Sequence, residues 1–238
     1  MTSDAGMTRL AILCLYLCTA GPAAADFIRS NLRFTLYHEL GHAVIDQLSL
    51  PVFGTEETAA DSFGIVLADR LHPEEEMQVI LTDMTALSRA EAVERIFDPW
   101  DQYMPDAQRL ARAICLAYGL NPAERLPLAR ALGMPASAAD ACVEDATQVR
   151  AAWAPVMERL RPKPGATPTE SLRPGRHGKA LRLLGRDIER VNEAIVLPRP
   201  VPVTNVACGE DNAYYFHIDE RIEFCSEMVE ALSARGLR

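Results

Sequence analysis

The segment Asn31–Leu48 most restricts how this chain can fold, because it combines an apolar row with two histidines four residues apart. The row recurs at spacings of four and consists of Leu32, Leu36, Leu40, Val44 and Leu48. Such a spacing is typical of a helix with one buried face. Residues four apart also project from one side of a helix, so His38 and His42 lie together beside the row. The sequence therefore predicts a partly buried helix that holds two imidazoles side by side.

The two imidazoles can bind one metal ion, and Glu39 lies beside that ion without having to bind it. Zinc lowers the pKa of a bound water molecule to near neutrality, and a carboxylate in this place can take the proton. The pattern His38-Glu39-x-x-His42 therefore predicts a zinc-activated water and a Glu general base. The alternative is a pair of ordinary core or surface histidines, because so short a pattern also arises by chance.

A catalytic zinc site needs a third protein ligand and keeps one position open. Fourteen residues separate His42 from Glu57, which begins a Glu-Thr-Ala-Ala-Asp segment that ends at Asp61. On a helix these two acids share a face, so we expect Glu57 to bind the metal and Asp61 to accept the free N–H of a ligand histidine. Glu56 competes for the ligand role, but it lies about 100° around the helix from Glu57. The alternative for both acids is a solvated acidic face.

These residues resemble those of the gluzincins, the thermolysin-like zinc peptidases, which carry two histidines on one helix and a Glu-x-x-x-Asp segment on the next. The matching residues are His38, Glu39, His42, Glu57 and Asp61. Tyr37–His42, Pro51–Asp61, Ala113–Gly119 and the later Cys142 and Trp153 look more closely like a bacterial family of proposed metallopeptidases, catalogued as a domain of unknown function. The resemblance covers most of residues 30–160 and a C-terminal piece. It implies a zincin-like catalytic domain, one Zn²⁺ per chain and a peptide or protein substrate.

The C-terminal piece stands in an unusual place. The family usually has a Cys-Gly…Asn-Ala-Phe-Tyr strand before its zinc helix, whereas the similar residues here, Cys208-Gly209 and Asn212–Tyr215, come after it. The resemblance therefore implies a circularly permuted chain in which Asn212 and Ala213 bind the substrate backbone by strand addition. The alternative is an ordinary β-hairpin that only looks like this strand.

The resemblance also implies a catalytic role for Tyr215, as the donor that stabilises the tetrahedral oxyanion. The sequence departs from the family directly afterwards, with Phe216-His217 in place of the usual Asp-Pro. Tyr214 and His217 therefore stay candidates for the same role.

Residues 1–25 have the pattern of a secretory signal peptide, with a basic Arg9, an apolar run over Leu10–Leu17 and small residues up to Ala25. We expect cleavage after Ala25 and a periplasmic or extracellular protein. The alternative, a membrane anchor that stays in place, requires a longer apolar run. No stable membrane insertion is expected after cleavage.

Removal of residues 1–25 leaves four cysteines, and an even number in an exported chain indicates disulfides. Four cysteines allow three pairings. We favour Cys115–Cys142 and Cys208–Cys225, because each pair lies within one local substructure. Buried free thiols are the alternative.

The remaining pattern predicts an α+β fold, mostly helical, with a small β-sheet supplied by the C-terminal segment. We expect a zinc-binding helical portion over residues 26–160, a Pro-rich linker over 161–177, and a helix with strands over 178–238 that completes the same domain. Further helices are predicted at Glu56–Arg70, Arg89–Phe97, Asp106–Tyr118, Ala123–Leu132, Ser137–Leu160 and Lys179–Ile195. Strands are predicted at Val201–Ala207, Ala213–Ile218 and Arg221–Cys225, before a short terminal helix.

The composition narrows the classes of function. A net charge of -9 offers no basic stripe to phosphates, which argues against nucleic-acid binding. Three functions stay open: a secreted zinc metallopeptidase, a non-catalytic zinc-binding adaptor, and a zinc hydrolase that acts on another bond. The intact Glu39 argues against the adaptor, because a non-catalytic zinc site has no use for a base. The motif specifies an activated water and not the bond that it attacks.

Overall fold

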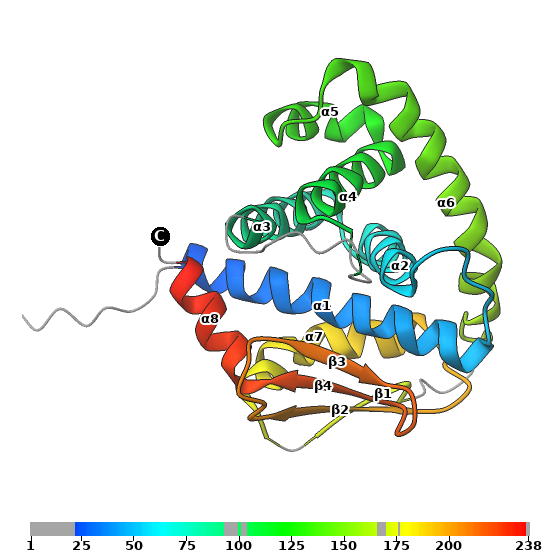
Figure 1. Ribbon diagram of the computed structural model, residues 1–238. Coiled ribbons are helices and arrows are strands. Elements are labelled where there is room, and N and C mark those ends of the chain that lie inside the picture. The colour runs from blue at the N-terminus through cyan, green and yellow to red at the C-terminus, as the bar shows by residue number, and fades with distance from the viewer. Residues whose placement is uncertain (1–21, 93–99, 101–103, 166–169, 176, 237–238) are drawn as a thin grey trace, which may run out of the picture.

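The computed structural model describes residues 22–92, 100, 104–165, 170–175 and 177–236 (Figure 1). The helices are α1 (Pro22–Leu48), α2 (Glu56–Leu71), α3 (Glu74–Ala92), α4 (Asp106–Leu120), α5 (Pro122–Ala131), the short 3₁₀ helix η1 (Ala136–Ala138), α6 (Ala139–Arg159), α7 (Lys179–Ala194) and α8 (Ser226–Gly236). The strands are β1 (Leu172–Pro174), β2 (Val201–Val206), β3 (Ala213–Phe216) and β4 (Arg221–Cys225). Helices predominate, which confirms the predicted α+β class.

The four strands form one mixed sheet in the order β1-β2-β4-β3. β1 pairs in parallel with β2, and β2 in parallel with β4. β3 pairs antiparallel with β4, so that Ala213 lies opposite Phe224 and Tyr215 lies opposite Ile222. β3 is therefore an edge strand with one side unpaired within the sheet.

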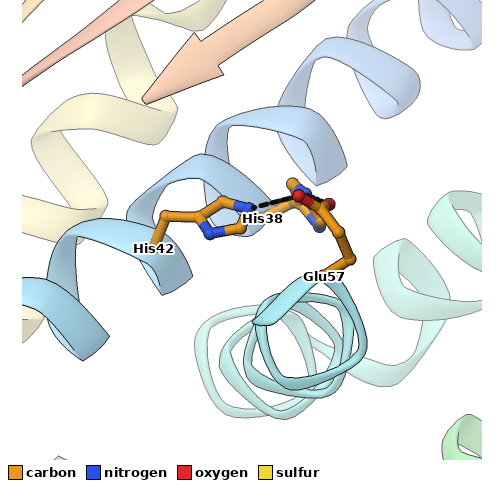
Figure 2. Close-up of side chains that lie close together, drawn as sticks. All are labelled: His38, His42 and Glu57. Carbon is orange, nitrogen blue, oxygen red and sulfur yellow. Dashed lines mark hydrogen bonds and ion pairs between the residues drawn. The ribbon is translucent and has the colours of Figure 1, made fainter. Parts of the chain in front are cut away.

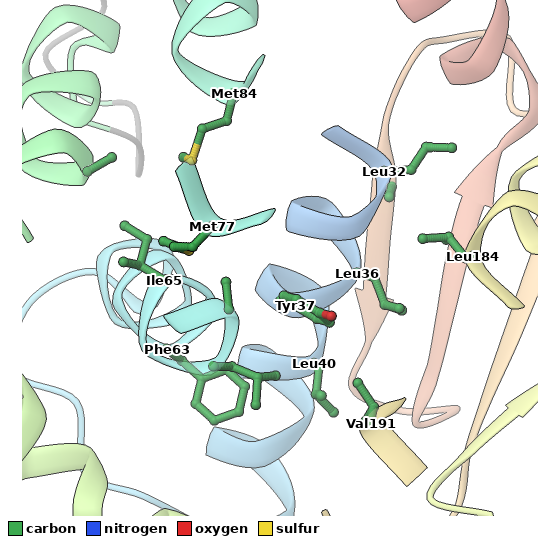
Figure 3. Packing of buried hydrophobic residues seen from close by; sticks show 14 of the residues in the cluster. Leu32, Leu36, Tyr37, Leu40, Phe63, Ile65, Met77, Met84, Leu184 and Val191 are labelled. Atoms are coloured by element: carbon green, nitrogen blue, oxygen red, sulfur yellow. The ribbon is translucent and has the colours of Figure 1, made fainter. Parts of the chain in front are cut away.

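Helix α1 is the central element of the fold. Figure 1 shows it running between the helices α2–α6 on one side and the sheet on the other, and it contacts α2, α3, α7, α8 and β3. Its predicted apolar row is buried except for Leu48, which is partly exposed. Leu32, Leu36 and Leu40 have no exposed surface and face Leu184 and Val191 of α7 (Figure 3). Burial of that row fixes the rotation of α1 and hence the direction of its histidines.

Helix α2 begins where the sequence provides a cap. Thr55 has an extended backbone, and its hydroxyl accepts the N–H of Thr58, as an N-cap does. Gly54 before it has φ +119, a conformation that favours glycine. The cap fixes the first turn of α2, which carries Glu56 and Glu57.

Helices α1 and α2 approach closely at Gly41. A Cβ atom on Gly41 would lie 2.9 Å from the Cα of Ala60, so a larger residue would push the helices apart. The small side chains that the sequence places at both positions let two backbones meet between the histidines of α1 and the acids of α2.

A buried ion pair joins α1 to α7. The Nε of Arg33 donates to Oδ1 of Asp187 over 2.7 Å, and Asp187 has no exposed surface. Arg29 donates to the other oxygen of Asp187 over 3.4 Å. Ionic contacts therefore tie the N-terminal helix to the C-terminal segment, in addition to apolar packing.

Several boundaries differ from the sequence predictions. α1 already begins at Pro22, and residues 1–21 lie outside the described part of the chain. α3 was not predicted over most of its length; the predicted helix Arg89–Phe97 overlaps only its last turn, and 93–97 lie outside the described residues. The segment 161–177, predicted to be a linker, contains strand β1. Leu172 of this strand is buried, and the strand pairs with β2. The predicted helix Ser137–Leu160 corresponds to η1 and α6, which ends at Arg159 and contains Pro155.

Both expected disulfides are present. Cys115 is bonded to Cys142, which joins α4 to α6, and Cys208 is bonded to Cys225 at the end of β4. Among the described residues, no helix combines the length and the apolar character needed to cross a membrane.

Candidate metal centre

His38, His42 and Glu57 bring their side chains together between α1 and α2, with two imidazoles from one helix and a carboxylate from the other (Figure 2). One ligand atom of each residue lies within 4.8 Å of the others. Both histidines are buried, with 6% and 7% of their surface exposed. The predicted ligand set therefore meets at one point.

The spacing of these atoms fits a tetrahedral metal ion. Nε2 of His38 lies 3.2 Å from Nε2 of His42 and 3.1 Å from Oε2 of Glu57. Nε2 of His42 lies 3.5 Å from Oε1 of Glu57. Ligand atoms at the usual zinc distances of about 2.0–2.1 Å are about 3.3 Å apart in a tetrahedron. Three donor groups at this spacing match the protein ligands of a catalytic zinc site, which keeps a fourth position open.

Two carboxylates of α2 orient the histidines. Nδ1 of His38 donates to Oδ1 of Asp61 over 2.8 Å, and Nδ1 of His42 donates to Oε1 of Glu56 over 2.7 Å. With the Nδ1 protons held there, both Nε2 atoms present lone pairs to the ligand point. Asp61 thus accepts the N–H of a histidine, the contact that the sequence predicts. Glu56, which competed with Glu57 for the ligand role, instead contacts Nδ1 of His42.

Arg109 of α4 holds Asp61 in turn. Its Nε donates to Oδ2 and one terminal nitrogen donates to Oδ1, each over 2.6 Å. Sequence reasoning did not single out this arginine, because nothing in the local pattern of α4 indicates that it faces α2. A bidentate pair of this kind fixes the plane of the carboxylate that orients His38.

The site is arranged to favour positive charge. Burial raises the pKa of Asp61, but hydrogen bonds from His38 and Arg109 outweigh it and bring the pKa to about 2. Burial also raises the pKa of Glu57, but hydrogen bonds with the two histidines outweigh this effect and hold that pKa far below its usual range. Burial lowers the pKa of His38, yet hydrogen bonds to Asp61 and Glu57 raise it to about 9. Ionised carboxylates around the two imidazoles suit a bound cation.

Glu39 lies next to the ligands but is not one of the converging three. Its side chain is buried, and burial raises the pKa of its carboxyl group, while the neighbouring His38 and His42 lower it. The backbone N–H of Tyr215 donates to this carboxylate. Strand β3 therefore contacts the predicted base directly, although Tyr215 follows Glu39 by 176 positions in the chain.

The free edge of β3 faces this site. The N–H of Cys225 donates to the carbonyl of Asn212 over 2.9 Å, so this pair is hydrogen-bonded. Antiparallel pairs alternate, and the backbone groups of Ala213 and Tyr215 therefore point away from β4. The N–H of Ala213 donates to the side-chain oxygen of Asn212 over 2.9 Å. The carbonyl of Ala213 is left pointing outward along the open edge.

The candidates for the oxyanion donor lie at different places. The hydroxyl of Tyr215 donates to Oδ2 of Asp46 over 2.8 Å. Its hydrogen bond is therefore made to the turn of α1 after His42 and not to one of the three converging residues. The ring of His217 is centred 6.5 Å from that of His42 and is about half exposed. Tyr214 lies at the exposed side of β3 and its hydroxyl accepts from Asn212 over 3.0 Å. The His217 ring therefore lies beside a candidate ligand histidine, whereas the two tyrosine hydroxyls are bonded elsewhere.

A cavity of about 450 Å³ opens beside the metal centre. His38 and Glu39 form part of its wall, and Asn212 and Ala213 form another part. Its remaining walls come from α1, α2, α3, α4, α8 and the loop before β3. The cavity thus joins the candidate base to the free edge of β3.

Comparison with known proteins connects this geometry to one family. A family model described as "Putative metallopeptidase" matches residues 19–157, more than half of the 238 residues. The match includes the histidine pair and Glu57 but ends before the C-terminal strands. No curated protein and no solved structure matches the chain.

Proposed function

The chain belongs to this metallopeptidase family, and on that premise we propose that it is an exported zinc-dependent peptidase. The convergence of two Nε2 atoms and one carboxylate, 3.1–3.5 Å apart, is the observation that carries the proposal. His38, His42 and Glu57 would hold one Zn²⁺. Nitrogen and carboxylate ligands of this kind suit zinc, and three of them leave one position open.

Bound zinc would supply an acidified water molecule and polarise the substrate carbonyl. Glu39 is placed to take the proton from that water and later to give it to the leaving amine, as a general base and acid. Its neighbours support this role, because the N–H of Tyr215 fixes the carboxylate and burial keeps solvent from it. Glu56 and Asp61 keep the histidines in the tautomer that binds metal.

The substrate would be a peptide or protein bound in extended form along β3. Asn212 and Ala213 line the cavity, and the Ala213 carbonyl points to the open edge, where it would accept an N–H of the substrate backbone. This edge favours a peptide over other zinc-hydrolase substrates, because main-chain pairing recognises only a peptide. For the oxyanion we retain Tyr215 as the proposed donor, which requires its hydroxyl to leave Asp46.

Export is the proposed location. The two disulfides are compatible with an oxidising compartment, and the first residues carry the pattern of a cleaved leader. The competing function, a zinc-binding adaptor without turnover, provides no reason for a buried carboxylate beside the ligands and inside the cavity wall.

Replacement of the base tests the proposal. Purified protein should hold one zinc per chain and cleave peptides from a mixed library. Glu39→Gln should keep its zinc and melting temperature while hydrolysis falls by about 10²–10⁴-fold, because an amide takes no proton at neutral pH. Glu57→Gln, the matched ligand variant, should lose metal and activity together.

Equal cleavage by wild type and Glu39→Gln, with zinc in both, would rule out the peptidase and favour the adaptor. Equal zinc in wild type and His42→Ala would rule out the metal centre itself.

A further inference from the structure

The segment 206–212 leads into the strand edge proposed to bind substrate, and packing does little to hold it. Val206, Ala207 and all of 209–212 are exposed, and Cys208 is half-buried. Gly209 has φ +87, so the chain reverses direction there. An exposed segment of this kind has many conformations in solution unless specific bonds restrict it.

Four bonds connect it to one short stretch at the junction of β4 and α8, and Arg235 near the end of α8 adds an ion pair with Asp211 over 2.8 Å. Cys208 is bonded to Cys225, the last residue of β4. The N–H groups of Cys208 and Gly209 donate to the carboxylate of Glu227 over 3.2 and 2.9 Å. The N–H of Cys225 donates to the carbonyl of Asn212 over 2.9 Å. The same cysteine is thus both the disulfide partner of Cys208 and the strand partner of Asn212.

The far end of this attachment is firmly held. Cys225 has no exposed surface, and neither does Phe224 beside it. β4 lies between β2 and β3 in the sheet, so it is paired on both sides. The disulfide therefore attaches an exposed segment covalently to a rigid inner strand.

We propose that the Cys208–Cys225 disulfide, assisted by Glu227, is a positioning device for substrate binding that sets the direction of Asn212 and Ala213 toward the metal centre. The inference rests on the proposed peptidase function. The other disulfide has no such position, since Cys115 and Cys142 join α4 to α6 on the helical side of α1. One bond thus serves the substrate edge and the other serves the helical layer.

The physical reason is preorganisation. If the disulfide is absent, a peptide must order segment 206–212 as it binds, and the cost of fixing those backbone conformations is subtracted from its affinity. The ligands of the metal lie on α1 and α2 and do not depend on this segment. Substrate affinity should therefore fall while metal affinity stays the same.

The test compares two double variants of the full-length, zinc-loaded protein. Cys208→Ser/Cys225→Ser should raise KM for a cleaved peptide by about 10–100-fold. That factor corresponds to the entropic cost of fixing the backbone of about one to two residues. Its kcat and zinc content should stay close to those of wild type. Cys115→Ser/Cys142→Ser is the matched control, because the disulfide that it removes closes a loop of similar length. The two cysteines are 27 positions apart, against 17 for Cys208 and Cys225. It should lower the melting temperature with KM unchanged.

Glu227→Ala gives a second measurement in case the first variant folds poorly. It keeps the disulfide and removes the acceptor of the Cys208 and Gly209 N–H groups, so KM should rise by a smaller factor. Glu230→Ala, an exposed acid on the same helix, should have no effect on KM.

An unchanged KM in both Cys208→Ser/Cys225→Ser and Glu227→Ala would overturn this inference and leave the peptidase standing. An equal rise of KM in the two double variants would also overturn it, since the effect would then be general loss of stability. A wild-type protein that cleaves no peptide would overturn the proposed function and this inference together.

Discussion

At the residue scale, the metal centre shows what spacing alone can predict. Helical periodicity predicted that His38 and His42 share one face and that Glu57 shares another with Asp61. The choice of Glu57 as third ligand rested on the ligand number of zinc and on the gluzincin resemblance. The partner of the His42 Nδ1 atom could not be predicted in the same way. Glu56 is the first residue of α2, and its direction depends on how the loop after α1 delivers that helix. The contact is tertiary, so periodicity within either helix carries no sign of it.

Removal of the Glu56 side chain should weaken metal binding without removing a ligand. Glu56→Ala should raise the dissociation constant for zinc by about 10–100-fold, as is usual for a residue that orients a ligand histidine. Glu56→Gln should be milder, because the amide oxygen still accepts the Nδ1 proton. Titration against a competing chelator measures this.

Glu75→Ala is the control, since it also removes an acid from the first turn of a helix but lies at the surface of α3. If Glu56→Gln loses as much affinity as Glu57→Gln, Glu56 is itself a ligand and the orienting role is wrong.

At the element scale, the contact between α1 and α2 limits which residue can stand at Gly41. Gly41→Ala places a Cβ atom 2.9 Å from the Cα of Ala60 and should separate the two helices. We expect a loss of about 1–3 kcal/mol of unfolding free energy, and weaker zinc binding. Chemical denaturation and zinc titration measure the two effects.

Gly185→Ala is the matched control, because it lies in the interior of α7 with nothing within 4 Å of its new Cβ atom. That substitution should stabilise the protein by about 0.5–1 kcal/mol. Equal effects of the two substitutions would show that the helices do not meet closely at Gly41.

The start of α3 should be sensitive to acid. Hydrogen bonds from Arg125 of α5 bring the pKa of Glu74 from its ordinary 4.5 to about 2, against the opposing effect of burial. A pKa that is lowered on folding stabilises the protein above the unfolded value, and this contribution is lost as the pH falls toward 2. Between about pH 4.5 and 2, unfolding free energy should therefore fall more steeply in wild type than in Glu74→Gln.

Urea denaturation at several pH values gives the two slopes. Glu75→Gln, the neighbouring exposed acid, should keep the wild-type slope. Parallel slopes for wild type and Glu74→Gln would contradict the assignment of this acid sensitivity to Glu74.

Two elements show the limits of local pattern. α3 was missed although Met77, Ile80, Leu81 and Met84 follow helical spacing and are all buried, so the signal was present in the sequence. β1 was missed for a different reason. It has three residues and ends in a proline, too short for a visible alternation, and its place is fixed only by pairing with β2.

At the scale of the whole molecule, the ion pair between α1 and α7 should contribute to cooperativity. Asp187→Asn leaves the buried Arg33 with only the more distant Glu76, 3.8 Å away, and breaking a buried ion pair typically costs about 3–5 kcal/mol. We expect a single unfolding transition at a correspondingly lower urea concentration. Glu189→Gln, an exposed position on the same helix, should change little. A loss below about 1 kcal/mol would show that the pair is not needed to join the two parts.

The circular permutation inferred from the sequence stays a proposal, and the structure provides two observations that support it. β3 lies against α1, with its backbone bonded to Glu39. Helix α8 ends beside the start of α1, so closely that a Cβ atom on Gly236 would lie 2.9 Å from the ring of Phe27 (Figure 1). The sequence alone could order these elements but could not place them together, because no local pattern specifies contacts between distant segments.

The positions of the ligands and of the substrate edge along the chain also set an order of events. The proposed metal ligands and both orienting acids lie between residues 38 and 61, whereas the edge strand begins at Ala213. During synthesis, the side chains of the candidate metal centre therefore emerge long before the strand that would pair with a peptide. On the proposed function, cleavage of a substrate would have to wait until these last strands have folded onto α1.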